Sequence, residues 1–119
     1  MLRMVIDNEV ISIAHKLSSF GPGHKCAGLH GHDIRIVCEL RTQRDEPFPD
    51  HGMIKAIWRA WDHKFLNQLP DFTYKELDPT AENSVMVLAR LIMLNIPRYV
   101  ELHSLRWYET PNVYVEYLP

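Results

Sequence analysis

The sequence has little cysteine, no long apolar run and no strong excess of either charge, and each shortage excludes a class of protein. Two cysteines among 119 residues are too few for a disulfide-based scaffold. No apolar run approaches the roughly 20 residues that a membrane-spanning helix needs. A formal net charge of −2 gives no reason to expect a nucleic acid or an anionic membrane as a partner. Acidic residues interrupt the opening MLRMVIDNEV, which is unlike a signal peptide. We therefore expect a cytoplasmic protein that binds neither nucleic acid nor membrane.

The length and composition predict one globular domain that spans residues 1–119. Chains divide into domains of about 100–200 residues, and no repeat or linker interrupts this one. A hydrophobic content of 46% with 24% charged residues is ordinary for a globular protein. Because so small a body has a high surface-to-volume ratio, contacts with other subunits would help to stabilise it. The seven histidines are the unusual feature of the composition.

Hydrophobic patterns predict the order strand, strand, helix, helix, strand, strand. The strand at 32–42 is the clearest, because Ile34, Ile36, Cys38 and Leu40 alternate with residues that are charged except for Val37. The second helix begins near Asp78-Pro79-Thr80, where an N-cap residue precedes a proline. The other expected elements are a strand at 3–15, a loop at 17–31, a helix at 53–61, the end of the second helix near Asn95, and a closing hairpin of 100–109 with 112–117. This order predicts an α+β fold, with an antiparallel four-stranded sheet and two helices on one face.

Three histidines share a face of the predicted sheet. His30 and His32 have the parity of the apolar residues in their strand, and His15 has the parity of Ile11 and Ile13. If the two strands pair, three imidazoles meet at one end of the core face. Three neutral imidazoles with an open fourth position make a catalytic zinc site. The alternative is three separate polar residues beside a glycine-rich loop, each hydrogen-bonded or solvated.

The two cysteines have different settings. Cys26 lies four residues before His30, so it is a fourth zinc ligand of a closed structural site, a reactive thiol beside an open site, or an inert small residue. Spacing alone does not decide among these three. Cys38 lies on the apolar face of its strand and is most simply a core residue.

Five motifs together resemble the 6-pyruvoyltetrahydropterin synthase and 6-carboxytetrahydropterin synthase family. They follow the family's order and rough spacing over nearly the whole chain. The motifs are AHKL at 14–17, HKCAGLHGH at 24–32, DHKFLN at 62–67, PTAEN at 79–83 and ET at 109–110.

The resemblance implies roles for individual residues. It matches His15, His30 and His32 to zinc ligands, Cys26 to the catalytic thiol, and Asp62 and His63 to the rest of a proton-transfer set. It matches Glu109, in the pair Glu109-Thr110, to the carboxylate that anchors the pterin ring. Lys25 and Lys16 flank the metal motif and are candidates to bind a triphosphate. From residue type alone, the alternatives are a solvated helix end for Asp62-His63, an exposed acid for Glu109 and solvated lysines.

The resemblance also implies a fold, an assembly and an activity. The fold is the tunnelling fold in ββααββ order, closed into a barrel by trimers that pair into a homohexamer with sites at subunit interfaces. The spacing Cys-x-x-x-His-Gly-His is similar to the queuosine-pathway branch of bacteria and archaea. This branch implies a zinc-dependent lyase, 6-carboxy-5,6,7,8-tetrahydropterin synthase, which converts 7,8-dihydroneopterin triphosphate and releases acetaldehyde and triphosphate. The alternatives are a 6-pyruvoyltetrahydropterin synthase and a non-catalytic pterin- or zinc-binding protein.

One segment departs from the family pattern. Pro49-Asp50-His51-Gly52 takes the place of a Val-x-Asp-Phe-like strand end, and only eleven residues separate Asp50 from Asp62. About one helical turn is therefore missing. We expect Pro49–Gly52 to form the strand end, and the shorter helix to affect where Asp62 and His63 lie.

Overall fold

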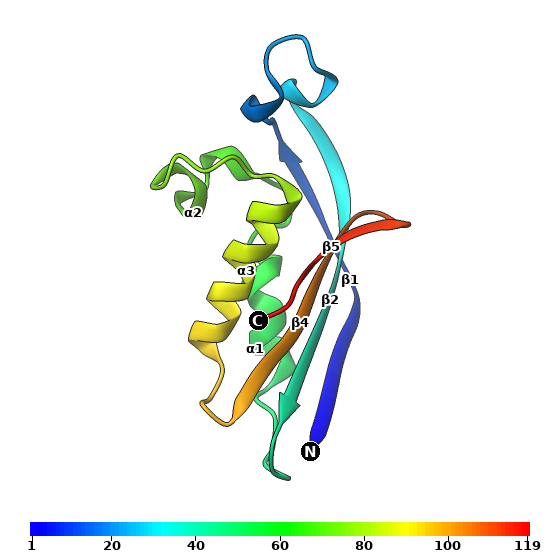
Figure 1. Ribbon diagram of the computed structural model, residues 1–119, viewed down its shortest axis with the longest axis vertical. Helices are drawn as coiled ribbons and strands as arrows, with labels where there is room; N and C mark the ends of the chain where they lie inside the picture. Colours follow the sequence, from blue (N-terminus) through cyan, green and yellow to red (C-terminus); the bar gives the residue numbers. More distant parts are fainter.

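The computed structural model describes residues 1–119, and its strands form one twisted sheet with helices on one face (Figure 1). The molecule is elongated, with extents of 53 × 30 × 23 Å. The strands are β1 (Leu2–His15), β2 (His30–Thr42), β3 (Lys64–Phe65), β4 (Val100–Thr110) and β5 (Val113–Tyr117). The helices are α1 (His51–Arg59), α2 (Pro70–Thr73) and α3 (Ala81–Asn95), and 3-10 turns lie at 18–20, 25–27 and 66–68. The predicted α+β class is confirmed.

The sheet has five strands in the order β3-β1-β2-β4-β5, so the predicted count of four is wrong. The four long strands are antiparallel, and β3 pairs in parallel with β1 only at Ile13 and Ala14. The prediction of two helices missed α2, which has four residues. Segments of two and four residues are too short to show a period of 2.0 or 3.6, and this explains both errors.

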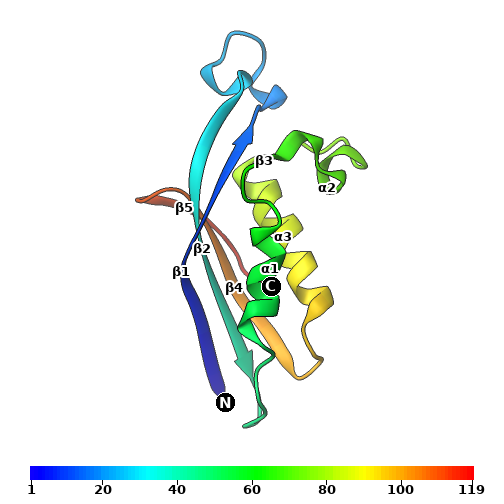
Figure 2. The same cartoon turned by 180° about the vertical axis from the view of Figure 1, so that it is seen from behind.

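The core lies between the sheet and helices α1 and α3, which cover the same face (Figure 2). Ile34, Ile36, Cys38 and Leu40 are fully buried, as the alternation of β2 predicts. Complete burial of an aliphatic side chain contributes about 1.5–3 kcal/mol each. The complete burial of Cys38 confirms it as a core residue, and the same burial raises the pKa of its thiol to about 12. The helices contribute the buried residues Ile54, Trp58, Val85, Leu88, Ala89 and Ile92.

The prediction that Pro49–Gly52 ends a strand is wrong. Strand β2 ends at Thr42, and Asp50 is instead the N-cap of α1. The Gly52 N–H donates to the Asp50 carboxylate at 3.0 Å. An aspartate after a proline suits a helix start, because its carboxylate accepts from an amide that the helix itself leaves unpaired. At the other end of α1, Glu9 of β1 accepts hydrogen bonds from Trp58 and Arg59.

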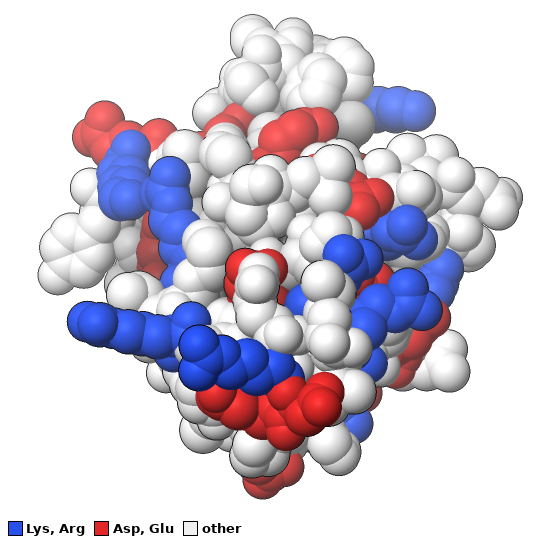
Figure 3. Space-filling model, turned by 60° about the horizontal axis from the view of Figure 1, so that its bottom comes forward, with Lys and Arg blue, Asp and Glu red and all other residues white.

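None of the helices is both long and apolar enough to cross a membrane. On the face shown in Figure 3, lysine and arginine side chains lie among aspartates and glutamates. Several of these charges are paired between strands, as in Arg35 with Asp7 at 3.0 Å and Arg106 with Glu116 at 3.2 Å. The charged residues therefore form ion pairs on the sheet rather than one region of a single sign.

We expect Asp50→Ala to lower the free energy of unfolding by about 1 kcal/mol, because the Gly52 amide loses its acceptor at the start of α1. Asp50→Asn keeps a capping oxygen and should match the unchanged protein. Urea denaturation followed by circular dichroism measures both. Equal stability of the Ala and Asn variants would contradict the capping role.

Candidate metal centre

Three imidazoles converge at the end of the β1–β2 pair, as the parity argument predicts. In the antiparallel register His15 lies opposite His30, and Ile13 lies opposite His32. The ring centroids are 4.4 Å apart for His15 and His30, and 5.1 Å apart for each of the other two pairs. One nitrogen of each ring lies within 4.8 Å of the others, a spacing that could hold a metal ion. Gly31 lets the backbones of β1 and β2 lie close together here, because a Cβ at this position would be only 3.3 Å from the Ile13 carbonyl oxygen.

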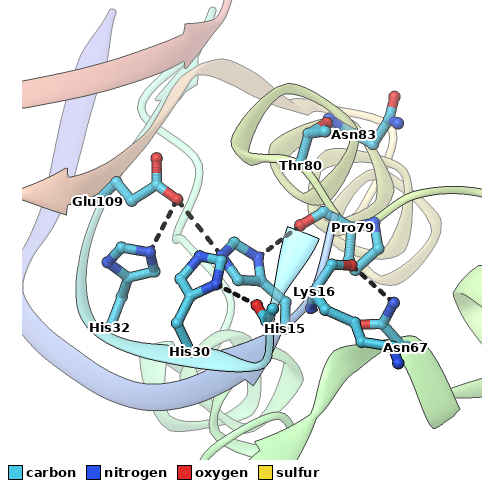
Figure 4. A network of polar contacts seen from close by, with 10 residues as sticks. His15, Lys16, His30, His32, Asn67, Pro79, Thr80, Asn83 and Glu109 are labelled. Atoms are coloured by element: carbon cyan, nitrogen blue, oxygen red, sulfur yellow. Dashed lines mark hydrogen bonds and ion pairs between the residues drawn. The ribbon is translucent and has the colours of Figure 1, made fainter. Parts of the chain in front are cut away.

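Backbone carbonyls fix the tautomers of two of these rings (Figure 4). The Nδ1 atoms of His15 and His30 lie 2.8 Å from the carbonyl oxygens of Pro79 and Gly28 respectively. A carbonyl only accepts, so each Nδ1 carries the hydrogen and each Nε2 keeps its lone pair. The Nε2 of His15 is buried and has no hydrogen-bond partner. An unpaired buried acceptor is costly, and a bound cation would satisfy it, so these residues fit a divalent metal.

The buried ring of His15 is held in the form that binds metals. Burial lowers the pKa of His15 from its ordinary value, the Pro79 carbonyl opposes this, and the neighbouring His30 and His32 lower it further. The Glu109 carboxylate raises it slightly in return. The neutral imidazole therefore persists to lower pH than in an exposed histidine.

Side chains from later in the chain hold the end of β1 in place. The Asn67 amide donates to the Lys16 carbonyl at 2.9 Å and accepts from the Lys16 N–H at 3.0 Å. Asp78 accepts from the backbone amides of Ser18 and Ser19. Burial by itself would raise the pKa of Asp78, but the hydrogen bonds from Ser19 and Ser18 outweigh it and lower that pKa. Sequence reasoning missed these two positioning residues, although Asn67 lies in a quoted motif.

The start of α3 is tied to the same site. Its N-cap is Thr80, which accepts from the Asn83 N–H at 3.1 Å, so the predicted N-cap before the proline, Asp78, is wrong by two residues. The Asn83 side chain donates to the Asp78 carbonyl at 2.8 Å. The segment that presents the Pro79 carbonyl to His15 is therefore held from both sides. Glu82 lies in the first turn, where the helix dipole favours an acid.

Glu109 lies beside the imidazoles. Its Oε1 is 3.3 Å from Nε2 of His32 and 3.7 Å from Nε2 of His15, and its side chain is 29% exposed. Figure 4 shows the carboxylate directed toward both rings. Glu109 is thus a member of the cluster rather than a freely exposed acid at a strand end.

The three residues matched to proton transfer are only partly brought together. An Asp62 oxygen lies 3.7 Å from Nε2 of His63, and the other oxygen accepts from the Ser12 N–H at 2.8 Å. Cys26 lies in the turn at 25–27, where its N–H donates to Nδ1 of His24 at 3.0 Å. No hydrogen bond or ion pair in the structure joins Cys26 to Asp62 or His63. The His63 side chain is 81% exposed, and its backbone has a left-handed φ of 59°.

The two remaining candidates lie at the surface. Lys25 is exposed and forms no ion pair in the structure. Thr110 is the exposed last residue of β4, and its hydroxyl accepts from the Asn112 N–H at 3.4 Å in the turn to β5. The roles of Lys25 and Thr110 in substrate binding therefore stay predictions.

A family model described as 6-pyruvoyl tetrahydropterin synthase matches residues 5–119. A probable 6-carboxy-5,6,7,8-tetrahydropterin synthase of Halobacterium salinarum is 32% identical over 117 residues, covering 85% of this chain and 77% of that protein. A 6-carboxy-5,6,7,8-tetrahydropterin synthase of Rickettsia felis is 30% identical, covering 81% of this chain and 87% of that one.

Solved structures share the fold. The 6-pyruvoyl tetrahydropterin synthase of Caenorhabditis elegans superposes with a TM-score of 0.73 at 21% identity, covering 100% of this chain and 97% of that one. The Plasmodium vivax 6-pyruvoyl tetrahydropterin synthase gives a TM-score of 0.66 at 15% identity, covering 98% and 96%. At these identities the likeness shows the fold alone.

We expect the metal-free protein to lose stability as the pH falls below about 6.5, the ordinary pKa of histidine. Below that pH the unfolded chain binds a proton at His15 that the folded chain, with its lowered pKa, does not. The slope from this residue is at most about 1.4 kcal/mol per pH unit. Urea titrations of chelator-treated protein at pH 7.5 and 5.5 measure it.

His15→Gln should reduce this pH dependence, whereas His63→Gln, at an exposed position, serves as the matched control and should keep it. If His15→Gln leaves the slope unchanged, His15 is not its source.

Proposed function

The chain belongs to the 6-pyruvoyl tetrahydropterin synthase family, and on this basis we propose that it is a zinc-dependent lyase of the 6-carboxy-5,6,7,8-tetrahydropterin synthase type. Its substrates would be 7,8-dihydroneopterin triphosphate and one water molecule, and its products 6-carboxytetrahydropterin, acetaldehyde and triphosphate, in queuosine biosynthesis. The observation that carries the proposal is the convergence of His15, His30 and His32, with the unpartnered buried Nε2 of His15. The names of the relatives and the Cys-x-x-x-His-Gly-His spacing support this activity over 6-pyruvoyltetrahydropterin synthesis.

In this proposal the three histidines hold the metal, and the backbone carbonyls of Pro79 and Gly28 orient two of them. Zinc suits neutral imidazole ligands at this spacing. When bound, it would polarise the hydroxyl groups of the substrate's side chain and acidify the neighbouring carbon–hydrogen bonds. The protein's contribution is to present the Nε2 lone pairs to one point from two adjacent strands.

Protons would be moved by Cys26, Asp62 and His63. A cysteine thiolate in the loop that leads to His30 is a suitable base for the acidified carbon. Asp62 is held by the Ser12 N–H and lies beside His63, so it can orient that imidazole as it accepts or returns a proton. The exposure of His63 leaves its ring free to meet a substrate or a neighbouring subunit.

The substrate would be held at its two ends. Glu109 offers a carboxylate that can accept two hydrogen bonds from the amino and ring nitrogens of the pterin, and Thr110 follows it at the end of β4. Lys25 and Lys16, which flank the metal motif, would bind the triphosphate through charge.

We also propose that the chain forms a homohexamer of paired trimers. Strand β3 covers β1 at only two positions, and nothing in the chain pairs with the outer edge of β5. Val5, Val10 and Val113 on these edge strands are 47%, 58% and 60% exposed. Open apolar edges invite pairing with another chain, and ring closure of several sheets would remove them.

Incubation of the zinc-loaded protein with 7,8-dihydroneopterin triphosphate should release acetaldehyde together with triphosphate. Triphosphate without acetaldehyde would favour the 6-pyruvoyltetrahydropterin product. Release of neither would favour a non-catalytic protein.

Cys26→Ala should lower the rate of acetaldehyde release by about 10²–10⁴-fold, the usual contribution of a positioned acid or base. The bound zinc, measured by metal analysis, should not change, because Cys26 is not among the proposed ligands. A variant that loses its zinc would instead identify Cys26 as a fourth ligand and remove the case for an open catalytic site.

A further inference from the structure

The position of Glu109 indicates more than an anchor for the substrate's ring. Its Oε1 lies 3.3 Å and 3.7 Å from the Nε2 atoms of His32 and His15. Two ligands of one tetrahedral zinc, each bonded at about 2.0–2.1 Å, lie roughly 3.3–3.4 Å from each other. The distance from the Glu109 oxygen to His32 matches this ligand-to-ligand separation, and the distance to His15 exceeds it by about 0.3 Å.

The contact between Glu109 and His15 joins two groups that both accept hydrogen bonds. The Nδ1–H of His15 donates to Pro79, so its Nε2 presents a lone pair, and an ionised carboxylate has no hydrogen to donate. Two such groups repel each other at 3.7 Å unless a positive charge lies between them. A shared divalent cation supplies that charge and also satisfies the buried Nε2.

No lysine or arginine of the chain pairs with Glu109. The glutamates Glu9, Glu39 and Glu116 each pair with an arginine, and Glu109 contacts only the two imidazoles. The Glu109 carboxylate therefore lacks the arginine partner that neutralises each of these three glutamates.

The backbone explains how Glu109 reaches the cluster. The β2–β4 ladder ends at the pair Arg35–Tyr108, and the β4–β5 ladder is irregular between Tyr108 and Thr110. Glu109 is thus paired with neither neighbouring strand, while Trp107 before it is buried. Glu109 has the same parity as the buried Leu105 and Trp107, so alternation along β4 places its side chain on the core face, where the histidines lie.

We propose that Glu109 is the fourth ligand of the metal in the substrate-free protein and that it leaves the metal when substrate oxygens bind. This inference rests on the proposed function for the identity of the displacing ligand. The metal centre is then closed by an exchangeable carboxylate, and the same carboxylate becomes available to the pterin ring once it is displaced.

The test is metal binding in the absence of substrate. Metal-free protein is titrated with zinc against a chromophoric chelator, and with cobalt(II), whose visible absorption reports the number and type of its ligands. Glu109→Gln should raise the zinc dissociation constant at least tenfold and change the cobalt spectrum. The matched control is Glu101→Gln, the same substitution on the same strand at an exposed position, which should change neither.

Two results would overturn the proposal. An unchanged dissociation constant and cobalt spectrum in Glu109→Gln would show that the carboxylate is not a ligand. A thiolate-to-cobalt charge-transfer band in the unchanged protein would assign the fourth position to Cys26. Both readouts are independent of turnover, so they are distinguishable from a failure to release acetaldehyde, which would count against the proposed function alone.

Displacement is tested with the cobalt-loaded protein and 7,8-dihydroneopterin, which carries the side-chain hydroxyls without the triphosphate. Its addition should change the visible cobalt(II) absorption of the protein without substitutions, because oxygens of the added compound replace the Glu109 carboxylate on the metal. A spectrum that stays the same at saturating 7,8-dihydroneopterin, with binding verified by fluorescence, would refute the exchange.

Discussion

The register between β1 and β2 is the constraint on which the rest of the site depends. Because successive side chains point to opposite faces, a slip by one residue would turn the histidines of one strand away from those of the other. The register is held by packing, since Ile11, Ile13, Ile34 and Ile36 are all buried on the core face. The same alternation that buries these residues brings His15 opposite His30.

A bulge in β1 allows both halves of the strand to bury side chains on the same face of the sheet. Ile6 is buried at an even position, whereas Ile11, Ile13 and His15 are buried at odd ones. The ladder shifts between Ile6 and Glu9, where Asn8 adopts a left-handed φ of 59° that asparagine tolerates better than most residues. The bulge changes the face on which the following residues lie, so both halves of β1 contribute to one core and His15 points inward.

Sequence reasoning succeeded where a pattern repeats over several residues and failed where a single contact decides. Alternation in β2 predicted the core face, and the parity of three histidines predicted their convergence. The N-cap role of Asp50 was missed, because an aspartate before a short helix and one at a strand end look alike in sequence. Glu109 shares the parity of the buried Leu105 and Trp107, which predicts the face of β4 on which it lies, but its contact with His15 and His32 was missed because its carboxylate was matched to the pterin ring. The proton-transfer set of Cys26, Asp62 and His63 stays a prediction.

The exposed position of His63 follows from the open edge of the sheet. Its N–H donates to the Ser12 carbonyl at 2.7 Å, and its left-handed backbone, which costs about 1–3 kcal/mol, is held by this contact and by β3. The Asp62 carboxylate accepts from the N–H of the same Ser12. Asp62 and His63 are therefore both attached to β1 at Ser12, next to the two positions where β3 covers the outer edge of β1. Any strand that pairs with the uncovered part of β1 would run toward His63. If another copy supplies that strand, as in the proposed hexamer, the stability of this small domain and the completion of its site depend on the same contact.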